Sequence, residues 1–129
     1  MFYGVLDLKT HVLHFVNAGH CPPIVRHGDG TIVSLAPTRP VLGFMLDAAF
    51  RSERLRLASG DHLLLYTDGV SEAANEGGEE FGAERLAKTL DGGAQPLPEQ
   101  WRSIMEQVRN HANGVFADDA TMVLIAVGS

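Results

Sequence analysis

The stretch that decides the fold is Gly60-Asp61-His62-Leu63-Leu64-Leu65-Tyr66-Thr67-Asp68-Gly69-Val70. Its middle part, residues 62–67, is almost wholly apolar and follows the turn signal Ser59-Gly60-Asp61. Continuous apolarity predicts a β-strand buried on both faces, because a strand with one wet face alternates apolar and polar residues. Asp68 comes directly after this predicted strand, so its carboxylate lies at the C-terminal end of the strand.

A second apolar run, residues 121–127, carries its acidic residues at the opposite end, since Asp118-Asp119 comes before it. If the two runs pair antiparallel, both acidic turns reach the same rim of one sheet. If they are parallel, a strand length of roughly 20 Å separates the turns, at about 3.3 Å per residue. Only the antiparallel arrangement makes a shared cation site. Carboxylates with few histidines and cysteines nearby favour magnesium or manganese over zinc.

Each polar feature also has a simpler interpretation. An Asp-Gly pair after a strand is commonly a turn or a helix N-cap, and the same applies to Asp118-Asp119. His20, in the polar loop Asn17-Ala18-Gly19-His20, is either a ligand or acid, or a residue that stabilises its loop. Zinc, serine-hydrolase, phosphate-loop and dinucleotide motifs are absent from the sequence.

The rest of the chain predicts a β-rich first half followed by helices. Strands are expected at residues 2–8, 11–16, 23–27, 31–35 and 50–57, with Gly28-Asp29-Gly30 as a hairpin turn. Helices are expected at residues 70–75, 83–90 and 98–113. The last helix has an apolar stripe that we assign to the core, formed by Trp101, Ile104, Met105, Val108 and Ala112.

Composition limits the classes of function. The chain has 129 residues, 45% of them hydrophobic, and shows no repeat or long linker, so we expect one domain over residues 1–129. A formal charge of -6 argues against nucleic-acid binding. No apolar run approaches the ~20 residues that span a bilayer, and the start lacks a signal peptide, so we expect no membrane insertion and a cytoplasmic location. Cys21 is the single cysteine, which excludes an intrachain disulfide.

Several motifs occur in a fixed order along the chain. They are Tyr3-Gly4-Val5-Leu6-Asp7, Asn17-Ala18-Gly19-His20 with Pro22-Pro23, Val41-Leu42-Gly43, residues 60–70, Glu72-Ala73 with Asn75, Gly78-Glu79-Glu80-Phe81-Gly82, and Asp118-Asp119-Ala120-Thr121. From Phe2 to Val127 this series resembles the C-terminal half of the SpoIIE/RsbU branch of the PPM metal-dependent serine/threonine phosphatases. Its most specific element is Leu-Tyr-Thr-Asp-Gly-Val with Asp-Asp-x-Thr downstream.

The resemblance implies an α+β fold, part of an α-β-β-α sandwich with two antiparallel sheets and a two-metal site for Mn2+ or Mg2+ at one end. In such phosphatases a metal-bridging water attacks the phosphorus of a phosphoserine or phosphothreonine directly. By position, Asp68 and Asp118 match metal ligands, and Asp119 matches a neighbour that supports them. Asn17, Gly19 and His20 match a loop signature with a structural role, and Gly69 and Gly43 match positions that serve backbone geometry.

Two metal-binding motifs of the family's N-terminal half, Gly-Asp-(Phe/Tyr)-(Tyr/Phe)-Asp and Asp-x-x-Gly-His-Gly, do not occur in this sequence. We therefore expect a partial domain, the C-terminal half with the N-terminal portion missing, that has little activity alone. The resemblance implies a phosphoprotein substrate, such as a STAS-domain anti-anti-sigma factor, and a role in sigma factor regulation. The alternative is a non-catalytic, degenerate phosphatase fold that binds a regulatory protein or forms a homo-oligomer through exposed sheet edges.

Overall fold

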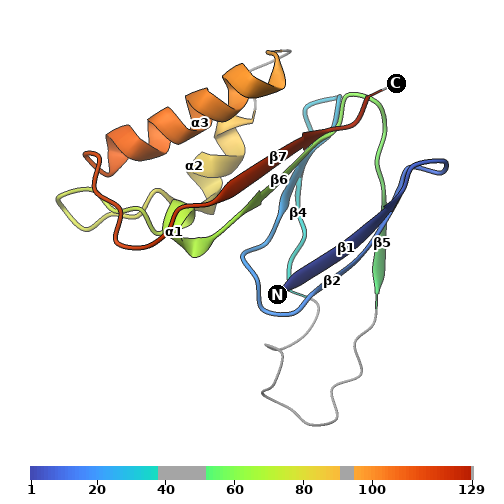
Figure 1. The fold of residues 1–129 in the computed structure, drawn as a ribbon, viewed down its shortest axis with the longest axis horizontal. Helices are drawn as coiled ribbons and strands as arrows, with labels where there is room; N and C mark the ends of the chain where they lie inside the picture. Colours follow the sequence, from blue (N-terminus) through green and yellow to red (C-terminus); the bar gives the residue numbers. More distant parts are fainter. Residues whose placement is uncertain (38–51, 91–94, 129) are drawn as a thin grey trace, which may run out of the picture.

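The structure, a computed structural model, describes residues 1–37, 52–90 and 95–128. Its strands form two antiparallel sheets, and its helices follow the sixth strand (Figure 1). The strands are β1 (Phe2–Asp7), β2 (Val12–Asn17), β3 (Ile24–Arg26), β4 (Ile32–Ser34), β5 (Glu53–Arg56), β6 (His62–Tyr66) and β7 (Met122–Ala126). The helices are α1 (Asp68–Ser71), α2 (Gly82–Thr89) and α3 (Leu97–His111).

The described residues make three layers. One sheet has the strand order β1-β2-β5 and the other has the order β4-β3-β6-β7. Helices α2 and α3 lie against the second sheet, on the side away from the first (Figure 1). This α+β arrangement with antiparallel sheets confirms the predicted fold class, and the described part supplies one helical layer and both sheets of the expected sandwich.

Strand β6, like β3, contributes buried side chains to both cores. The side chain of Leu64 packs in the cluster on the helix side, with Ile104 and Val108 of α3. The side chain of Leu63 packs on the opposite face, in the cluster between the sheets, with Leu13 and Phe15 of β2. The prediction of a strand buried on both faces is confirmed, because successive side chains of a strand point to opposite faces.

The other predicted strands are also present, with ends within a few residues of the expected ones. The hairpin at Gly28-Asp29-Gly30 joins β3 to β4, which pair antiparallel. The predicted strand at 50–57 appears as β5, and residues 50 and 51 lie outside the described residues, as does Gly43.

The predicted helix at 70–75 is misplaced. Helix α1 begins two residues earlier, at Asp68, and ends at Ser71. It begins early because the carbonyl of Thr67 accepts the first hydrogen bond, from the amide of Val70 at 3.0 Å. It ends early because Ala74 leaves the helix to form a bridge with Glu80.

Helix α3 buries only part of its predicted stripe. Ile104, Val108 and Ala112 are buried in the core, as expected. The assignment of Trp101 to the core is wrong, because its side chain is 39% exposed. The indole lies over the edge strand β7 and donates a hydrogen bond from Nε1 to the carbonyl of Met122 at 3.2 Å. An edge strand leaves the outer side of such a ring uncovered.

The end of β6 opposite Asp68 is fixed by a buried acid. The carboxylate of Asp61 is 2% exposed and accepts hydrogen bonds from the ring of His27 at 2.8 Å, the amide of Gly28 at 3.0 Å and the amide of Ala58 at 2.9 Å. These bonds tie the β3–β4 hairpin to the turn that enters β6. In the part of the chain that the structure describes, no helix is long and apolar enough to cross a membrane.

Candidate metal-binding rim

The two acidic turns lie at the same rim of one sheet. Strands β6 and β7 pair antiparallel, with Tyr66 opposite Met122 at the last rung of the ladder. Asp68 follows β6 after one residue, Thr67, and Asp118 precedes β7; both aspartate side chains are exposed. The antiparallel pairing that a shared site requires is therefore present.

The two aspartates make the same local hydrogen bond. One carboxylate oxygen of Asp68, Oδ1, accepts a hydrogen bond from the amide of Gly69 at 3.0 Å. The Oδ1 atom of Asp118 accepts one from the amide of Asp119 at 2.7 Å. The second oxygen of each carboxylate meets no hydrogen-bond donor among the described residues. Each aspartate can thus offer one oriented carboxylate oxygen to a cation.

The carboxylate oxygens of Asp68 and Asp118 suit a hard cation, but two carboxylates are few for a metal site. Carboxylate oxygens are the ligands that magnesium and manganese prefer. Within residues 1–37, 52–90 and 95–128, no group of three or more His, Cys, Asp or Glu side chains is arranged to hold a metal. Asp68 and Asp118 fit as two members of a ligand set that needs further oxygen atoms.

Further acidic side chains line a small hollow beside the rim. It measures about 160 Å³, and its lining includes Gly69, Glu72, Glu80, Ala117 and Asp118. The chain segment that carries Glu80 is held by the side chain of Asn75, whose Oδ1 accepts hydrogen bonds from the amides of Gly77 and Glu79. Sequence reasoning did not assign Glu72 or Glu80 to the site, although both occur in the ordered motifs.

Asn17 and His20 shape a loop that reaches the same rim. Asn17 is fully buried, accepts a hydrogen bond from the amide of His20 at 2.9 Å, and donates to the carbonyls of His20 and Leu35. The ring of His20 bonds through Nδ1 to the carbonyl of Cys21 at 2.8 Å. His20 also lines a hollow of about 170 Å³ with Thr67 and Thr121, so the loop lies beside the site.

The thiol of Cys21 lies close to the rim as well. Burial raises its pKa above the ordinary value, and the negative charge of Asp68 raises it further. The thiol therefore stays protonated at neutral pH in the metal-free chain, which leaves it a poor nucleophile.

Asp119 and Thr67 join the two turns through the backbone. The hydroxyl of Thr67 donates a hydrogen bond to the carbonyl of Asp119 at 3.0 Å. Gly69 lies directly against the same peptide group, with no space for a β-carbon. Sequence reasoning missed the contribution of Thr67, and the available signal was a hydroxyl-bearing residue between the strand and its terminal aspartate.

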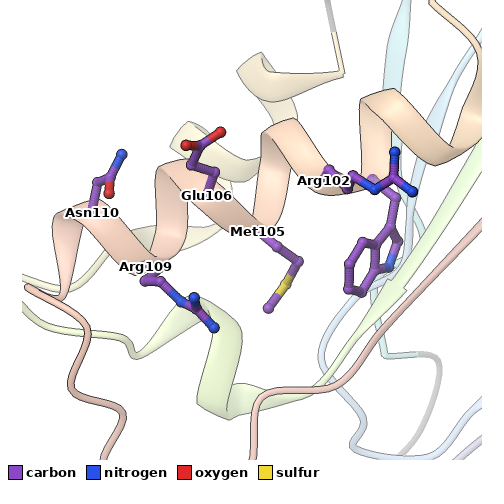
Figure 2. Close-up of a pocket in the computed structure, with 6 residues that line it drawn as sticks. Arg102, Met105, Glu106, Arg109 and Asn110 are labelled. Atoms are coloured by element: carbon purple, nitrogen blue, oxygen red, sulfur yellow. The ribbon is translucent and has the colours of Figure 1, made fainter.

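A separate hollow of about 360 Å³ lies along α3. Figure 2 shows that Met105 and Arg109 project from the same side of this helix, while Glu106 and Asn110 point elsewhere. None of the predicted site residues lines it. Its two arginines and half-buried methionine do not form a catalytic arrangement, so the rim remains the candidate site.

Comparison with known proteins places this geometry in a family. The family model of Stage II sporulation protein E (SpoIIE) matches residues 1–128. Protein IcfG of Synechocystis sp. is 32% identical over 126 residues, which are 97% of this chain and 20% of IcfG. Phosphoserine phosphatase RsbP of Bacillus subtilis is 37% identical over 70 residues, which are 54% of this chain and 17% of RsbP.

A solved structure shows the same fold. The manganese-presoaked phosphatase domain of SpoIIE from Bacillus subtilis matches with a TM-score of 0.78 at 19% identity, and the match covers 99% of this chain and 56% of that one. The chain thus spans less than two thirds of the length of each of these proteins.

Proposed function

The chain belongs to the SpoIIE family, and from this premise we propose that it carries part of the metal site of a protein serine/threonine phosphatase. The observation that supports the proposal most directly is the antiparallel pairing of β6 with β7, which brings Asp68 and Asp118 to one rim. A relative over about half of the chain bears the name phosphoserine phosphatase. The reaction is the hydrolysis of phosphoserine or phosphothreonine in a protein.

The roles of the residues follow from their positions. Asp68 and Asp118 bind Mn2+ or Mg2+ through the carboxylate oxygens that face no protein donor. Asp119 and Gly69 hold the two acidic turns together, while Asn17 and His20 keep the neighbouring loop in place. When bound, the metal ions lower the pKa of a coordinated water and neutralise charge on the phosphoryl oxygens.

The choice of metal follows from ligand chemistry. The candidate ligands at this rim are carboxylate oxygens, which favour Mn2+ or Mg2+ over zinc. The solved SpoIIE phosphatase domain was presoaked with manganese, which supports testing Mn2+ first.

We assign residues 1–129 to a single partial domain, the C-terminal half of the phosphatase domain. Two carboxylates are too few for a two-metal site, so we expect little turnover from this chain by itself. The substrate is a phosphoprotein, for which a STAS-domain anti-anti-sigma factor in the cytoplasm is the first candidate. The signalling role is sigma factor regulation, by analogy with the family.

A manganese-dependent assay with a serine-phosphorylated protein tests this function. It compares the 129-residue chain with a longer form that contains the Gly-Asp-(Phe/Tyr) motif. We expect activity only from the longer form, with loss of activity when Asp68 is replaced by Asn. An inactive longer form with both aspartates intact would overturn the enzymatic assignment, and rapid turnover by the short chain would overturn the argument from missing ligands.

The second candidate function is non-catalytic self-association. Strands β1 and β7 are the edges of their sheets, and their exposed side chains include Tyr3, Val5, Val123 and Ile125. Apolar side chains on a free strand edge favour pairing with another chain. Under this alternative, replacing Asp68 leaves oligomerisation unchanged and no activity depends on Mn2+.

A further inference from the structure

Thr67 occupies the position where β6 ends and the chain turns into α1. Its amide continues the ladder with β7 by donating a hydrogen bond to the carbonyl of Thr121 at 3.0 Å. Its own carbonyl accepts the hydrogen bond from Val70 that starts α1, and the amide of Thr121 does not bond to this carbonyl. The amide of Thr121 therefore needs another acceptor.

The side chain of Thr67 supplies that acceptor. Its hydroxyl oxygen accepts a hydrogen bond from the amide of Thr121 at 3.0 Å. The same hydroxyl donates to the carbonyl of Asp119 at 3.0 Å, which is a better acceptor position than the carbonyl of Thr121 at 3.5 Å. The Thr67 hydroxyl thus takes the place of the Thr67 carbonyl as the acceptor for the Thr121 amide. It also holds the turn before β7 through its hydrogen bond to the Asp119 carbonyl.

The consequence reaches both aspartates. Asp68 is the next residue after Thr67, and Asp118 is the residue before Asp119. The chain can leave the sheet at Asp68 without releasing β7, and the turn of Asp118 stays attached to the end of β6. A hydroxyl is required for this arrangement, since valine has nearly the same shape and can neither accept nor donate.

We propose that Thr67 is a positioning residue, which uses its side-chain hydroxyl to hold the acidic turns of Asp68 and Asp118 at one fixed separation. The inference rests on the proposed function only for the identity of the ion that the two carboxylates share. We call the two hydrogen bonds of the Thr67 hydroxyl, from the Thr121 amide and to the Asp119 carbonyl, the Thr67 clamp. The clamp is present in the metal-free chain, so it can be tested apart from catalysis.

The first test measures amide hydrogen exchange by NMR on the metal-free 129-residue chain. In Thr67→Val the amide of Thr121 loses its acceptor, and we expect it to exchange about tenfold faster, while amides in the middle of β6 keep their protection. Thr67→Ser retains a hydroxyl and should restore most of the protection. Thr121→Val is the matched control, because the Thr121 hydroxyl makes no hydrogen bond among the described contacts and its amide is unchanged.

The second test titrates Mn2+ and follows the paramagnetic broadening of the Gly69 and Asp119 amide signals. In the unmodified chain both signals should broaden with one midpoint, as expected for a shared ion. In Thr67→Val the midpoint should move to about tenfold higher Mn2+, and in Thr67→Ser it should stay close to the original value. This readout requires no turnover.

The outcomes separate the clamp from the metal site. Unchanged protection of Thr121 in Thr67→Val, or equal acceleration of every amide, overturns the positioning role. If the unmodified chain shows no broadening by Mn2+, the proposed function fails, and the exchange data still decide the role of Thr67. If Thr67→Val does not fold, the unmodified chain provides the measurement: a slowly exchanging Thr67 hydroxyl proton close to the Thr121 amide supports the clamp, and a freely exchanging one contradicts it.

Discussion

Gly69 and Asp119 touch through their backbones. A β-carbon at position 69 would lie 2.5 Å from the carbonyl oxygen of Asp119 and 2.8 Å from its carbonyl carbon. Neither atom belongs to a flexible side chain that could move aside. The close approach of the two acidic turns therefore depends on the absence of a side chain at Gly69.

Gly69→Ala should consequently destabilise the rim. We expect the free energy of unfolding to fall by about 1–3 kcal/mol, the usual cost of forcing a methyl group into a packed region. Urea denaturation measures this change. Gly128→Ala is the control, because no atom lies within 4 Å of a β-carbon at Gly128. Equal stability of the two variants would show that the turns separate without cost.

The two aspartates should act as a pair in binding Mn2+. We expect Asp68→Asn or Asp118→Asn to weaken binding by about a hundredfold, and Asp119→Asn, a supporting residue, by about tenfold. All three side chains are exposed, so unfolding free energies should change by no more than about 0.5 kcal/mol. Isothermal titration calorimetry gives the affinities. Additive losses in the double variant Asp68→Asn/Asp118→Asn would indicate two independent ions instead of a shared one.

Replacement of the buried Asp61 should lower stability in a pH-dependent way. Burial by itself raises the pKa of this carboxyl, but the hydrogen bonds from the Ala58 amide, the His27 ring and the Gly28 amide outweigh burial and leave the pKa below its usual value. At pH 7 we expect Asp61→Asn to cost about 1–3 kcal/mol, because the amide group cannot accept all three bonds.

The sign of the pH dependence follows from the lowered pKa. An acid with a lower pKa in the folded chain stabilises the fold while it is ionised, fully above its unfolded pKa of about 3.9. Its contribution disappears as the pH falls through the folded pKa. Thermal unfolding of wild type and Asp61→Asn should therefore differ at pH 7, and the difference should shrink as the pH falls below about 4 and disappear below the folded pKa. The exposed Glu76→Gln variant is the control, and a gap that persists at low pH would contradict the assignment.

Asn17→Ala should loosen the loop that carries His20. The substitution leaves the amide of His20 and the carbonyl of Leu35 without their side-chain partner in a buried position. We expect a loss of about 2–3 kcal/mol in unfolding free energy. Asn110→Ala on the exposed surface of α3 should be nearly neutral. If both variants unfold at the same urea concentration, the hydrogen bonds of Asn17 do not stabilise the loop.

Self-association should depend on the free edge of β7. Val123 is 50% exposed on this edge, and Val123→Lys places a charge there that opposes strand pairing. Light scattering over a concentration series should show less dimer in this variant than in the control Val115→Lys, whose residue is exposed outside any strand. A wild-type chain that stays monomeric throughout would exclude association as its function.

Features that depend only on neighbouring residues in the sequence could be predicted. The unbroken apolarity of residues 62–67 predicted a strand with two buried faces, and Leu63 and Leu64 lie in different clusters. The position of the acids relative to the apolar runs predicted a common rim once antiparallel pairing was assumed. Both inferences rest on the two-residue period of a strand.

Features that depend on distant partners were not predictable. Asp61 read as part of a turn, because its partner His27 is 34 residues away and nothing in the sequence joins them. Trp101 fitted an apolar stripe, but periodicity does not reveal where a sheet ends beneath a helix. The sequence predicted Thr67 only as the last residue of a strand. The hydrogen bonds between β6 and β7 are needed to show that its hydroxyl, and not its carbonyl, accepts the bond from the Thr121 amide.

Because β6 is buried on both faces, the backbone next to it at the rim is ordered before any cation binds. A strand that belongs to both clusters cannot detach from one without exposing the other, so its amides should open only when the whole chain unfolds. Only Thr67 separates Asp68 from this strand, and the Thr67 amide is bonded to β7, so the backbone at Asp68 is already fixed in the metal-free chain. Under the proposed function, ion binding would then require little further loss of conformational entropy on the β6 side, and the rim would be a preformed site rather than one assembled around its ion.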